Sequence, residues 1–316
     1  MIPFNDLDEA GVDMKAIAEY FLRDGGAPNR SFEIQSVRAL GDHSAFGSFS
    51  DGNATGLNID QGLIFTTGLA KEAVGPNSAP NKTTDWQGAG SSLLGTDSHD
   101  LSGMEIRFKA KRDMVLNWKT QFGSEEFDEF SPSVFDDKAG IFFSEIKTPK
   151  DNLESIDPEN LLSGPLDGPY SVNGFSKEQG MLKKYIQMNN ICKPLGWEYD
   201  GTTRQATTTK SAVLERGKTY AIAPMVSDSS DHLYDSGLAI GPKNKRVKNI
   251  DIFPRPEKVI FETPKDILKQ PIRENQVITE IAQKPMQSSA GSPAMRVIED
   301  MSMSLSPTIT EQQSLI

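Results

Sequence analysis

The spacing of hydrophobic residues changes from helical to alternating near residue 26. Before this point, Ile17, Tyr20 and Phe21 fall on one helical face, and Asp13 can cap the start of that helix. The glycine pair at 25–26 then ends it. The pattern therefore predicts one amphipathic helix at the N-terminus.

After residue 26, hydrophobic and polar residues alternate in short segments, as in half-buried antiparallel strands. The clearest strand is predicted for residues 113–122, with Leu116, Trp118 and Phe122 among the residues of its apolar face. Further strands are predicted for residues 32–40, 62–67, 104–111, 140–146, 211–214, 219–226 and 237–240. A second helix is predicted for about residues 176–188, as a small helical insertion. Short strands separated by turns and long loops favour a mainly β fold, a β-sandwich or jelly roll.

The C-terminal part of the chain has a different composition from residue 251 onwards. Prolines interrupt it at short intervals, and residues 288–292 form a Ser, Gly and Ala segment typical of linkers. We expect a β domain over residues 1–250 and an extended C-terminal arm over residues 251–316. A disordered tail is the alternative for this arm.

Composition restricts the partners of the chain. It contains 44 Asp and Glu against 33 Lys and Arg, a formal net charge of -11. An acidic protein repels nucleic acid and anionic lipid, so we expect neither as a direct partner. No segment approaches the roughly 18 consecutive apolar residues of a membrane helix, so no direct membrane insertion is expected. The single Cys192 allows no intrachain disulfide, and the acidic N-terminus does not resemble a signal peptide.

Two acidic segments are the candidate chemistry. The first, residues 122–137, has six acids and no Lys or Arg before Lys138, and the second, residues 228–236, has three acids. Each segment follows a predicted strand, and adjacent strands of one sheet would bring both to the same rim. Such a density of carboxylates costs electrostatic repulsion unless solvent or a cation relieves it. Oxygen ligands without thiolate or histidine favour calcium. The predicted ligands are Glu125, Glu126, Asp128, Asp137, Asp228, Asp231 and Asp235.

Two other readings of these acids stay open. One is a solvated acidic surface in which some residues cap turns. The other is a carbohydrate-active hydrolase that uses clustered acids such as Glu125 and Glu126, although neighbouring residues of a strand point to opposite faces.

Other motifs give weaker signals. Residues 51–56 begin like an EF-hand, but Gly62 stands where a bidentate Glu is required, so a turn is expected there. A nucleophile elbow, a P-loop and an H-E-x-x-H motif are all missing from the sequence. His43, His99 and His232 lie far apart, so a histidine metal site is not expected.

Three segments together resemble the choice-of-anchor L domain family. They are residues 47–77, which end in Ala-Val-Gly-Pro-Asn; residues 122–144, which begin Phe-Gly-Ser-Glu-Glu-Phe-Asp-Glu-Phe; and residues 228–237, which contain Tyr-Asp-Ser. The motifs follow one another in the family's order over about residues 14–241. The acids at Glu125, Glu126, Asp137, Asp228, Asp231 and Asp235 match the family pattern.

The resemblance implies a β-rich domain of bacterial surface and secreted proteins, attached through various C-terminal anchors. We therefore expect a non-enzymatic binding or adhesion module with an extracellular or cell-surface location. The chain shows neither a signal peptide nor a recognisable anchor, which also allows the virion surface, as a phage spike, receptor-binding or minor structural protein. The expected partners are a surface receptor or glycan, or neighbouring subunits contacted through the C-terminal arm.

Overall fold

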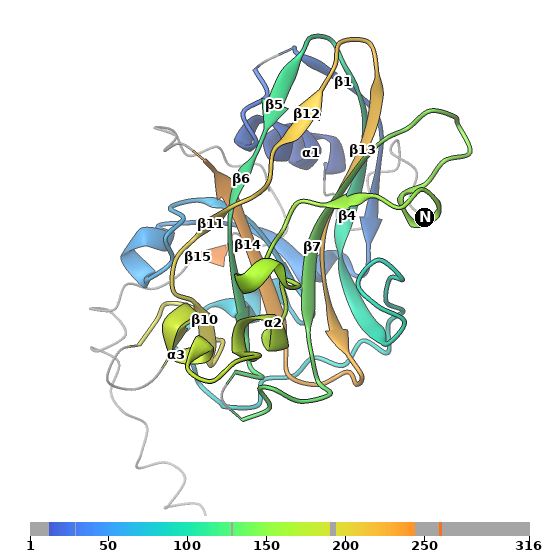
Figure 1. Cartoon of the computed structure of the whole chain (residues 1–316). Coiled ribbons are helices and arrows are strands. Elements are labelled where there is room, and N and C mark those ends of the chain that lie inside the picture. The colour runs from blue at the N-terminus through green and yellow to red at the C-terminus, as the bar shows by residue number, and fades with distance from the viewer. Residues whose placement is uncertain (1–12, 29, 128, 190–193, 244–258, 261–316) are drawn as a thin grey trace, which may run out of the picture. The chain divides into compact units, whose positions relative to one another are not determined.

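The two main sheets of the domain are antiparallel, apart from one parallel pair at an edge of the second sheet, and they share one core. The computed structural model describes residues 13–28, 30–127, 129–189, 194–243 and 259–260. The first sheet has the order β1-β4-β13-β7-β8 (Figure 1). Its strands are β1 (Phe32–Leu40), β4 (Ser98–Ala110), β13 (Thr219–Ser229), β7 (Lys138–Glu145) and β8 (Glu159–Asn160).

The second sheet has the order β15-β2-β3-β14-β6-β10-β9, and β11 also pairs with β6. Its strands are β15 (Val259–Ile260), β2 (Phe46–Ser50), β3 (Gly62–Thr66), β14 (Ser236–Pro242), β6 (Trp118–Ser124), β10 (Gly201–Thr203), β9 (Ile186–Met188) and β11 (Thr207–Thr208). A separate ribbon pairs β5 (Met114–Leu116) with β12 (Ala212–Leu214). The expectation of a mainly β sandwich is confirmed.

The helices are few and short. Helix α1 (Met14–Asp24) begins at Asp13, whose carboxylate accepts a hydrogen bond from the Ala16 amide at 3.0 Å, as predicted. The α-helices α2 (Val172–Ser176) and α3 (Met181–Tyr185) lie between β8 and β9. The 3₁₀-helices are η1 (His43–Ala45), η2 (Gly52–Thr55), η3 (Ala70–Ala73), η4 (Leu153–Ser155) and η5 (Pro165–Asp167).

Two predicted elements are wrong in detail. The strand predicted for residues 113–122 divides at Asn117, whose amide donates to the Gly25 carbonyl at 2.9 Å instead of continuing the ladder. Its first half therefore pairs with β12 and its second half with β14. The helix predicted for residues 176–188 forms only over residues 181–185, because α2 already ends at Ser176, Gly180 with a φ of 84° is the N-cap of α3, and residues 186–188 form strand β9.

The main core lies between the two sheets and is closed by α1. Ile106 and Ile222 of the first sheet and Phe65 and Phe122 of the second are fully buried in it. Trp118 stacks on Phe21 of α1 with ring centroids 4.6 Å apart, and its indole nitrogen donates to the Phe21 carbonyl at 2.8 Å. These contacts fix the helix against the sandwich.

The second sheet is buried on both faces, because loops cover its outer side. Ile64 and Ala239 point into a second core that also contains Trp197 and Tyr199. This explains why β2 and β3 are buried at every position.

A close approach of two aromatic rings to the second sheet requires glycine in the adjacent strands. Gly123 of β6 pairs with Gly237 of β14. A Cβ atom on Gly123 would lie 2.6 Å from the ring of Trp197, and one on Gly237 would overlap the ring of Tyr199. The two glycines thus allow residues 197–200 to lie against the ends of β6 and β14.

The predicted domain boundary lies outside the described residues, and so does most of the predicted arm. Two of its residues are placed: Val259 and Ile260 form β15, which pairs in parallel with β2 at the edge of the second sheet. The division into residues 1–250 and 251–316 stays a prediction.

Candidate functional site

Five of the predicted ligands gather at one end of the sandwich and are buried there. We call Glu125, Glu126, Asp137, Asp228 and Asp235 the acidic rim. Their residue exposures are 0% for the first four and 4% for Asp235. They adjoin the end of β6, the start of β7, the end of β13 and the start of β14. The reading as a solvated surface therefore does not describe these five side chains.

Asp137 joins the two sheets at this rim. Its Oδ1 accepts from the amide of Ser229, the last residue of β13, at 3.0 Å, and its Oδ2 accepts from the hydroxyl of Ser236, the first residue of β14, at 2.7 Å. β13 belongs to the first sheet and β14 to the second. One carboxylate thus connects both sheets where residues 230–235 pass between them.

We expected the two acidic segments to follow adjacent strands of one sheet, and this expectation is wrong. β6 pairs with β14, whereas β13 lies in the other sheet. The two acidic segments still meet, because the connection from β13 to β14 crosses from one sheet to the other at this end.

Glu126 lies beside Asp137. The Asp137 amide donates to Glu126 Oε2 over 3.5 Å, while Oε1 has no hydrogen-bond partner. Burial, together with the charges of Asp231 and Asp136, raises the pKa of Glu126 to about 8. Burial and then the neighbouring Glu126 also raise the pKa of Asp137 well above its usual range.

Glu125 faces a second group of acids. Neither of its carboxylate oxygens has a hydrogen-bond partner. Burial, and then the charges of Asp200, Glu198 and Asp235, raise its pKa to about 10; Lys82 opposes this shift. The Lys82 ammonium is already paired with Glu72 at 3.0 Å. Glu125 is therefore a protonated acid at neutral pH unless a cation replaces its proton.

Glu198 and Asp200 are rim neighbours that the sequence analysis missed. Glu198 Oε1 accepts from the amide and the hydroxyl of Ser78 at 2.8 and 2.7 Å. Asp200 accepts from the side-chain amide of Asn77. The alternation of buried Trp197 and Tyr199 with these two acids was the available sequence signal.

The carboxylate of Asp235 is fixed by a hydrogen bond from Thr84 and fits into the space that Gly68 leaves by having no side chain. Its Oδ1 accepts from the Thr84 amide at 2.7 Å, and its Oδ2 lies where a Cβ atom on Gly68 would stand. Burial raises the pKa of Asp235 to about 6, against the opposing hydrogen bonds from Thr84.

Asp228 completes the rim from the first sheet. Burial, and then Asp137, raise its pKa well above the usual range, and the hydroxyl of Thr67 lies near enough to oppose the shift. Asp235 and Asp100 also act on it. The five rim acids therefore influence one another, and each raises the cost of ionising its neighbours.

The other two predicted ligands are placed differently. Asp231 is partly exposed and accepts a hydrogen bond from the Leu233 amide at 3.1 Å. Asp128 lies outside the described residues. Within the described part of the chain, the carboxylates of the rim do not form a closed cage: the group with ligand atoms all within 4.8 Å of one another is Asp85, Asp100 and His232.

Two of the three histidines meet, against expectation. The rings of His99 and His232 lie 4.4 Å apart, while His43 lies beside Phe46 instead. They meet because residues 98 and 99 pair with residues 229 and 228 in the first sheet.

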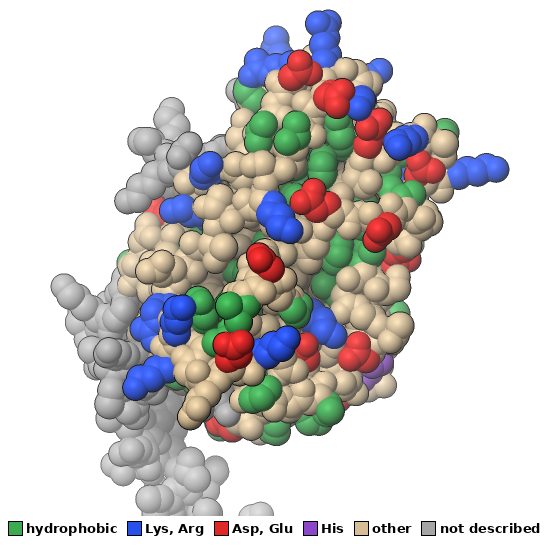
Figure 2. Space-filling view, in the orientation of Figure 1, with side chains coloured by type: hydrophobic (Ala, Val, Ile, Leu, Met, Phe, Trp, Pro, Cys, Tyr) green, Lys and Arg blue, Asp and Glu red, His purple; other side chains and the backbone are tan. Residues whose placement is uncertain are grey.

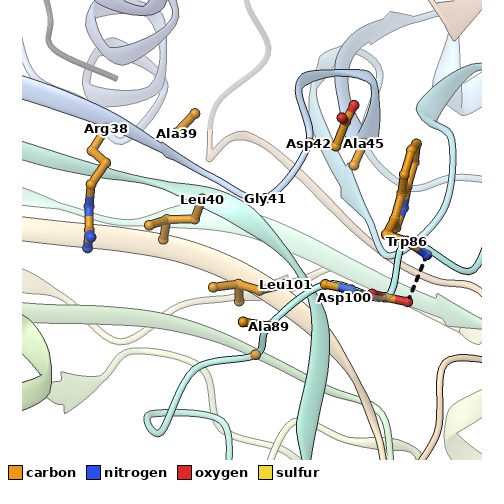
Figure 3. Close-up of a pocket in the computed structure, with 12 residues that line it drawn as sticks. Arg38, Ala39, Leu40, Gly41, Asp42, Ala45, Trp86, Ala89, Asp100 and Leu101 are labelled. Atoms are coloured by element: carbon orange, nitrogen blue, oxygen red, sulfur yellow. Dashed lines mark hydrogen bonds between the residues drawn. The ribbon is translucent and has the colours of Figure 1, made fainter. Parts of the chain in front are cut away.

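A pocket of about 360 Å³ lies beside this end of the first sheet (Figure 3). Its polar lining includes Arg38, Asp42 and Asp100, and its apolar lining includes Leu101 and Trp86. The indole nitrogen of Trp86 donates to the Thr67 carbonyl at 2.6 Å, which fixes the ring in the pocket wall.

One face of the molecule carries exposed charges of both signs. On the face shown in Figure 2, Lys and Arg side chains are interspersed with Asp and Glu, with no single acidic patch. The five rim acids do not contribute to this surface, because they are buried.

Comparison with known proteins identifies the family. A family model described as the choice-of-anchor L domain matches residues 12–243. The chain belongs to the choice-of-anchor L domain family. No curated protein and no solved structure matches the chain significantly.

The matched region of this choice-of-anchor L domain contains all seven predicted ligands and both sheets except β15. Membership indicates a surface-associated, non-enzymatic module. No helix in the described ranges is long and apolar enough to span a membrane.

The first prediction concerns stability without divalent cations. Rim acids have raised pKa values in the folded state, so between their ordinary values and the folded values the native protein holds more protons than the unfolded chain. Stability then falls as pH rises. In chelator, we expect the free energy of unfolding to decrease from about pH 5 to pH 8, measured by urea denaturation. A free energy that instead rises over this range would contradict the burial of protonated acids.

Proposed function

We propose that this domain is a cell-surface binding module whose acidic rim is neutralised by calcium. Family membership supports a surface-associated module without enzymatic activity. The observation that carries the calcium part is the burial of five carboxyl groups at one end of the sandwich, with no hydrogen-bond partner for either oxygen of Glu125.

Burying several carboxylates next to one another costs free energy, and a cation would reduce this cost. A buried carboxylate is stable only when it is protonated, hydrogen-bonded or paired with a positive charge. Lys82, the cation that acts on Glu125, already forms an ion pair with Glu72. Without a bound metal ion, the rim acids would have to be neutralised by protons, even at neutral pH. A divalent cation would replace these protons.

The donor chemistry of the rim fits calcium. The acids offer hard oxygen ligands without thiolate, and calcium takes six to eight such oxygens in flexible geometry. Glu125 and Glu126 each have an oxygen without a hydrogen-bond partner. Because the two side chains face different neighbours, each would hold its own ion, Glu126 together with Asp137 and Glu125 together with Asp235, after the carboxylates of each group move closer together.

The pocket is the proposed binding surface. It combines an aromatic ring, Trp86, with the charged groups of Arg38 and Asp42. An aromatic face with a few fixed polar groups is the usual composition of a small-ligand site and matches the apolar faces and hydroxyls of a glycan. The C-terminal arm would contact neighbouring surface subunits. Display on a virion is the alternative location.

The hydrolase alternative is not favoured by any geometry in the described residues. A catalytic carboxyl group must touch its substrate, whereas Glu125 and Glu126 are both fully buried. They also face different neighbours, Glu125 towards Asp200 and Glu126 towards Asp137. Their arrangement suits the cohesion of the rim.

The second prediction tests calcium directly. Thermal melting at pH 7.5 is compared in calcium, in magnesium and in chelator at equal ionic strength. A ligand at a hundredfold excess over its Kd stabilises the folded state by about 2.7 kcal/mol. We expect calcium to raise the Tm by several degrees and magnesium to act much less. The calcium effect should shrink towards pH 5, where protons compete for the same oxygens.

Matched variants locate the effect. Glu126→Gln or Asp235→Asn should remove most of the calcium response, while Glu178→Gln, at an exposed position, should retain it. Identical melting of the wild type in calcium and chelator would show that protons and hydrogen bonds alone neutralise the rim.

The third prediction separates binding from catalysis. A glycan panel is scored for both binding and hydrolysis at the same protein concentration. We expect binding without turnover, and loss of binding in Trp86→Ala, because the variant removes the aromatic wall of the pocket. Turnover that disappears in Glu125→Gln or Glu126→Gln would establish the hydrolase instead, and binding unchanged by Trp86→Ala would place the binding surface elsewhere.

A further inference from the structure

A mixed group of nitrogen and oxygen donors lies next to the acidic rim but shares no residue with it. It consists of Asp85, Asp100 and His232, whose ligand atoms all lie within 4.8 Å of one another. His232 Nδ1 lies 3.0 Å from Asp100 Oδ2 and 3.8 Å from Asp85 Oδ1. These residues come from three separate segments of the chain, so the fold brings them together.

Both carboxylates are held in place by neighbouring donors. Asp100 is buried, and its two oxygens accept from the Gly88 amide at 2.6 Å and the Trp86 amide at 3.3 Å. Asp85 accepts from the amide and the side chain of Gln87 at 2.9 and 2.6 Å. These hydrogen bonds lower the pKa of Asp85, with a smaller contribution from His232. Asp100 Oδ2 also lies within hydrogen-bonding distance of His232 Nδ1, at 3.0 Å, so a metal ion bound there would take the place of a proton between these two atoms.

The imidazole is oriented by a second histidine. The ring of His99 packs on that of His232 at 4.4 Å with an interplanar angle of 44°. The side chain of His232 is 24% exposed, and that of Asp85 is 40% exposed. The group is therefore accessible from solvent on one side and fixed by protein on the other.

We propose that Asp85, Asp100 and His232 bind a divalent transition-metal ion of the zinc type. Metal–ligand bonds of about 2.0–2.2 Å place two ligand atoms of one ion roughly 3.0–4.4 Å apart. The two distances from His232 Nδ1 already fall in this range. An imidazole nitrogen with two carboxylates selects a borderline ion such as zinc and disfavours calcium. Water would complete the coordination shell.

Such an ion would connect the wall of the pocket to the loop between β13 and β14. Asp100 and Trp86 both line the pocket, and the Trp86 amide donates to Asp100, as the dashed line in Figure 3 shows. His232 belongs to residues 230–235, which also contain Asp231 and lead to Asp235. The ion would thus fix Trp86 relative to the acidic rim.

The test uses the full chain without an affinity tag, titrated with zinc against a chromophoric chelator, and with cobalt as a spectroscopic probe. We expect one ion per chain and visible cobalt absorption. His232→Gln and Asp85→Asn should each weaken zinc binding by roughly tenfold to a hundredfold. His43→Gln is the matched control, because His43 lies beside Phe46 and away from the group, and its affinity should equal that of the wild type.

Two results would contradict the proposed zinc site. Absence of saturable zinc binding, or binding that survives both His232→Gln and Asp85→Asn, would show that His232 only forms an ion pair with the two aspartates. Melting in chelator confirms that each variant is folded. Because the ligand sets do not overlap, the calcium response of His232→Gln reports on the acidic rim independently of the zinc result.

Discussion

The structure depends on the burial of carboxyl groups at the point where the chain passes from the first sheet to the second, between β13 and β14. Asp137 accepts hydrogen bonds from the last residue of β13 and the first residue of β14, so the connection between the sheets is fixed by a buried carboxyl group. An isolated buried carboxylate is expensive in free energy. Each neighbouring acid makes the next ionisation harder, and the pKa of Glu125 rises to about 10. The rim therefore requires protons or a cation to remain folded.

The surrounding residues are explained by this requirement. Gly68 leaves the space that the Asp235 carboxylate occupies, and Gly123 and Gly237 leave the space for Trp197 and Tyr199. Glu198 and Asp200 alternate with these two aromatic residues along the chain, so packing of the rings places both acids beside the rim. The segment of residues 77–84 donates hydrogen bonds to Asp200, Glu198 and Asp235, from Asn77, Ser78 and Thr84 respectively. Motifs far apart in sequence are thus parts of one polar cluster.

Much of this arrangement could be predicted from the sequence, because its signals are local. Helix α1 has its cap and its apolar face, and the acids that match the family pattern fall at strand ends. Strand β2 was missed because it is buried on both faces and has no alternation. Glu198 and Asp200 were missed because their role depends on a covering loop. The meeting of His99 with His232 depends on the pairing of β4 with β13, which no local pattern contains.

Calcium titration calorimetry at pH 7.5, repeated in buffers with different ionisation enthalpies, measures the number of protons released when the ion binds. The account predicts calcium binding with release of at least one proton per ion, because the cation takes over oxygens that are protonated in its absence. Calcium binding without proton release would contradict the protonated rim. Absence of calcium binding would contradict the proposal that a cation neutralises it.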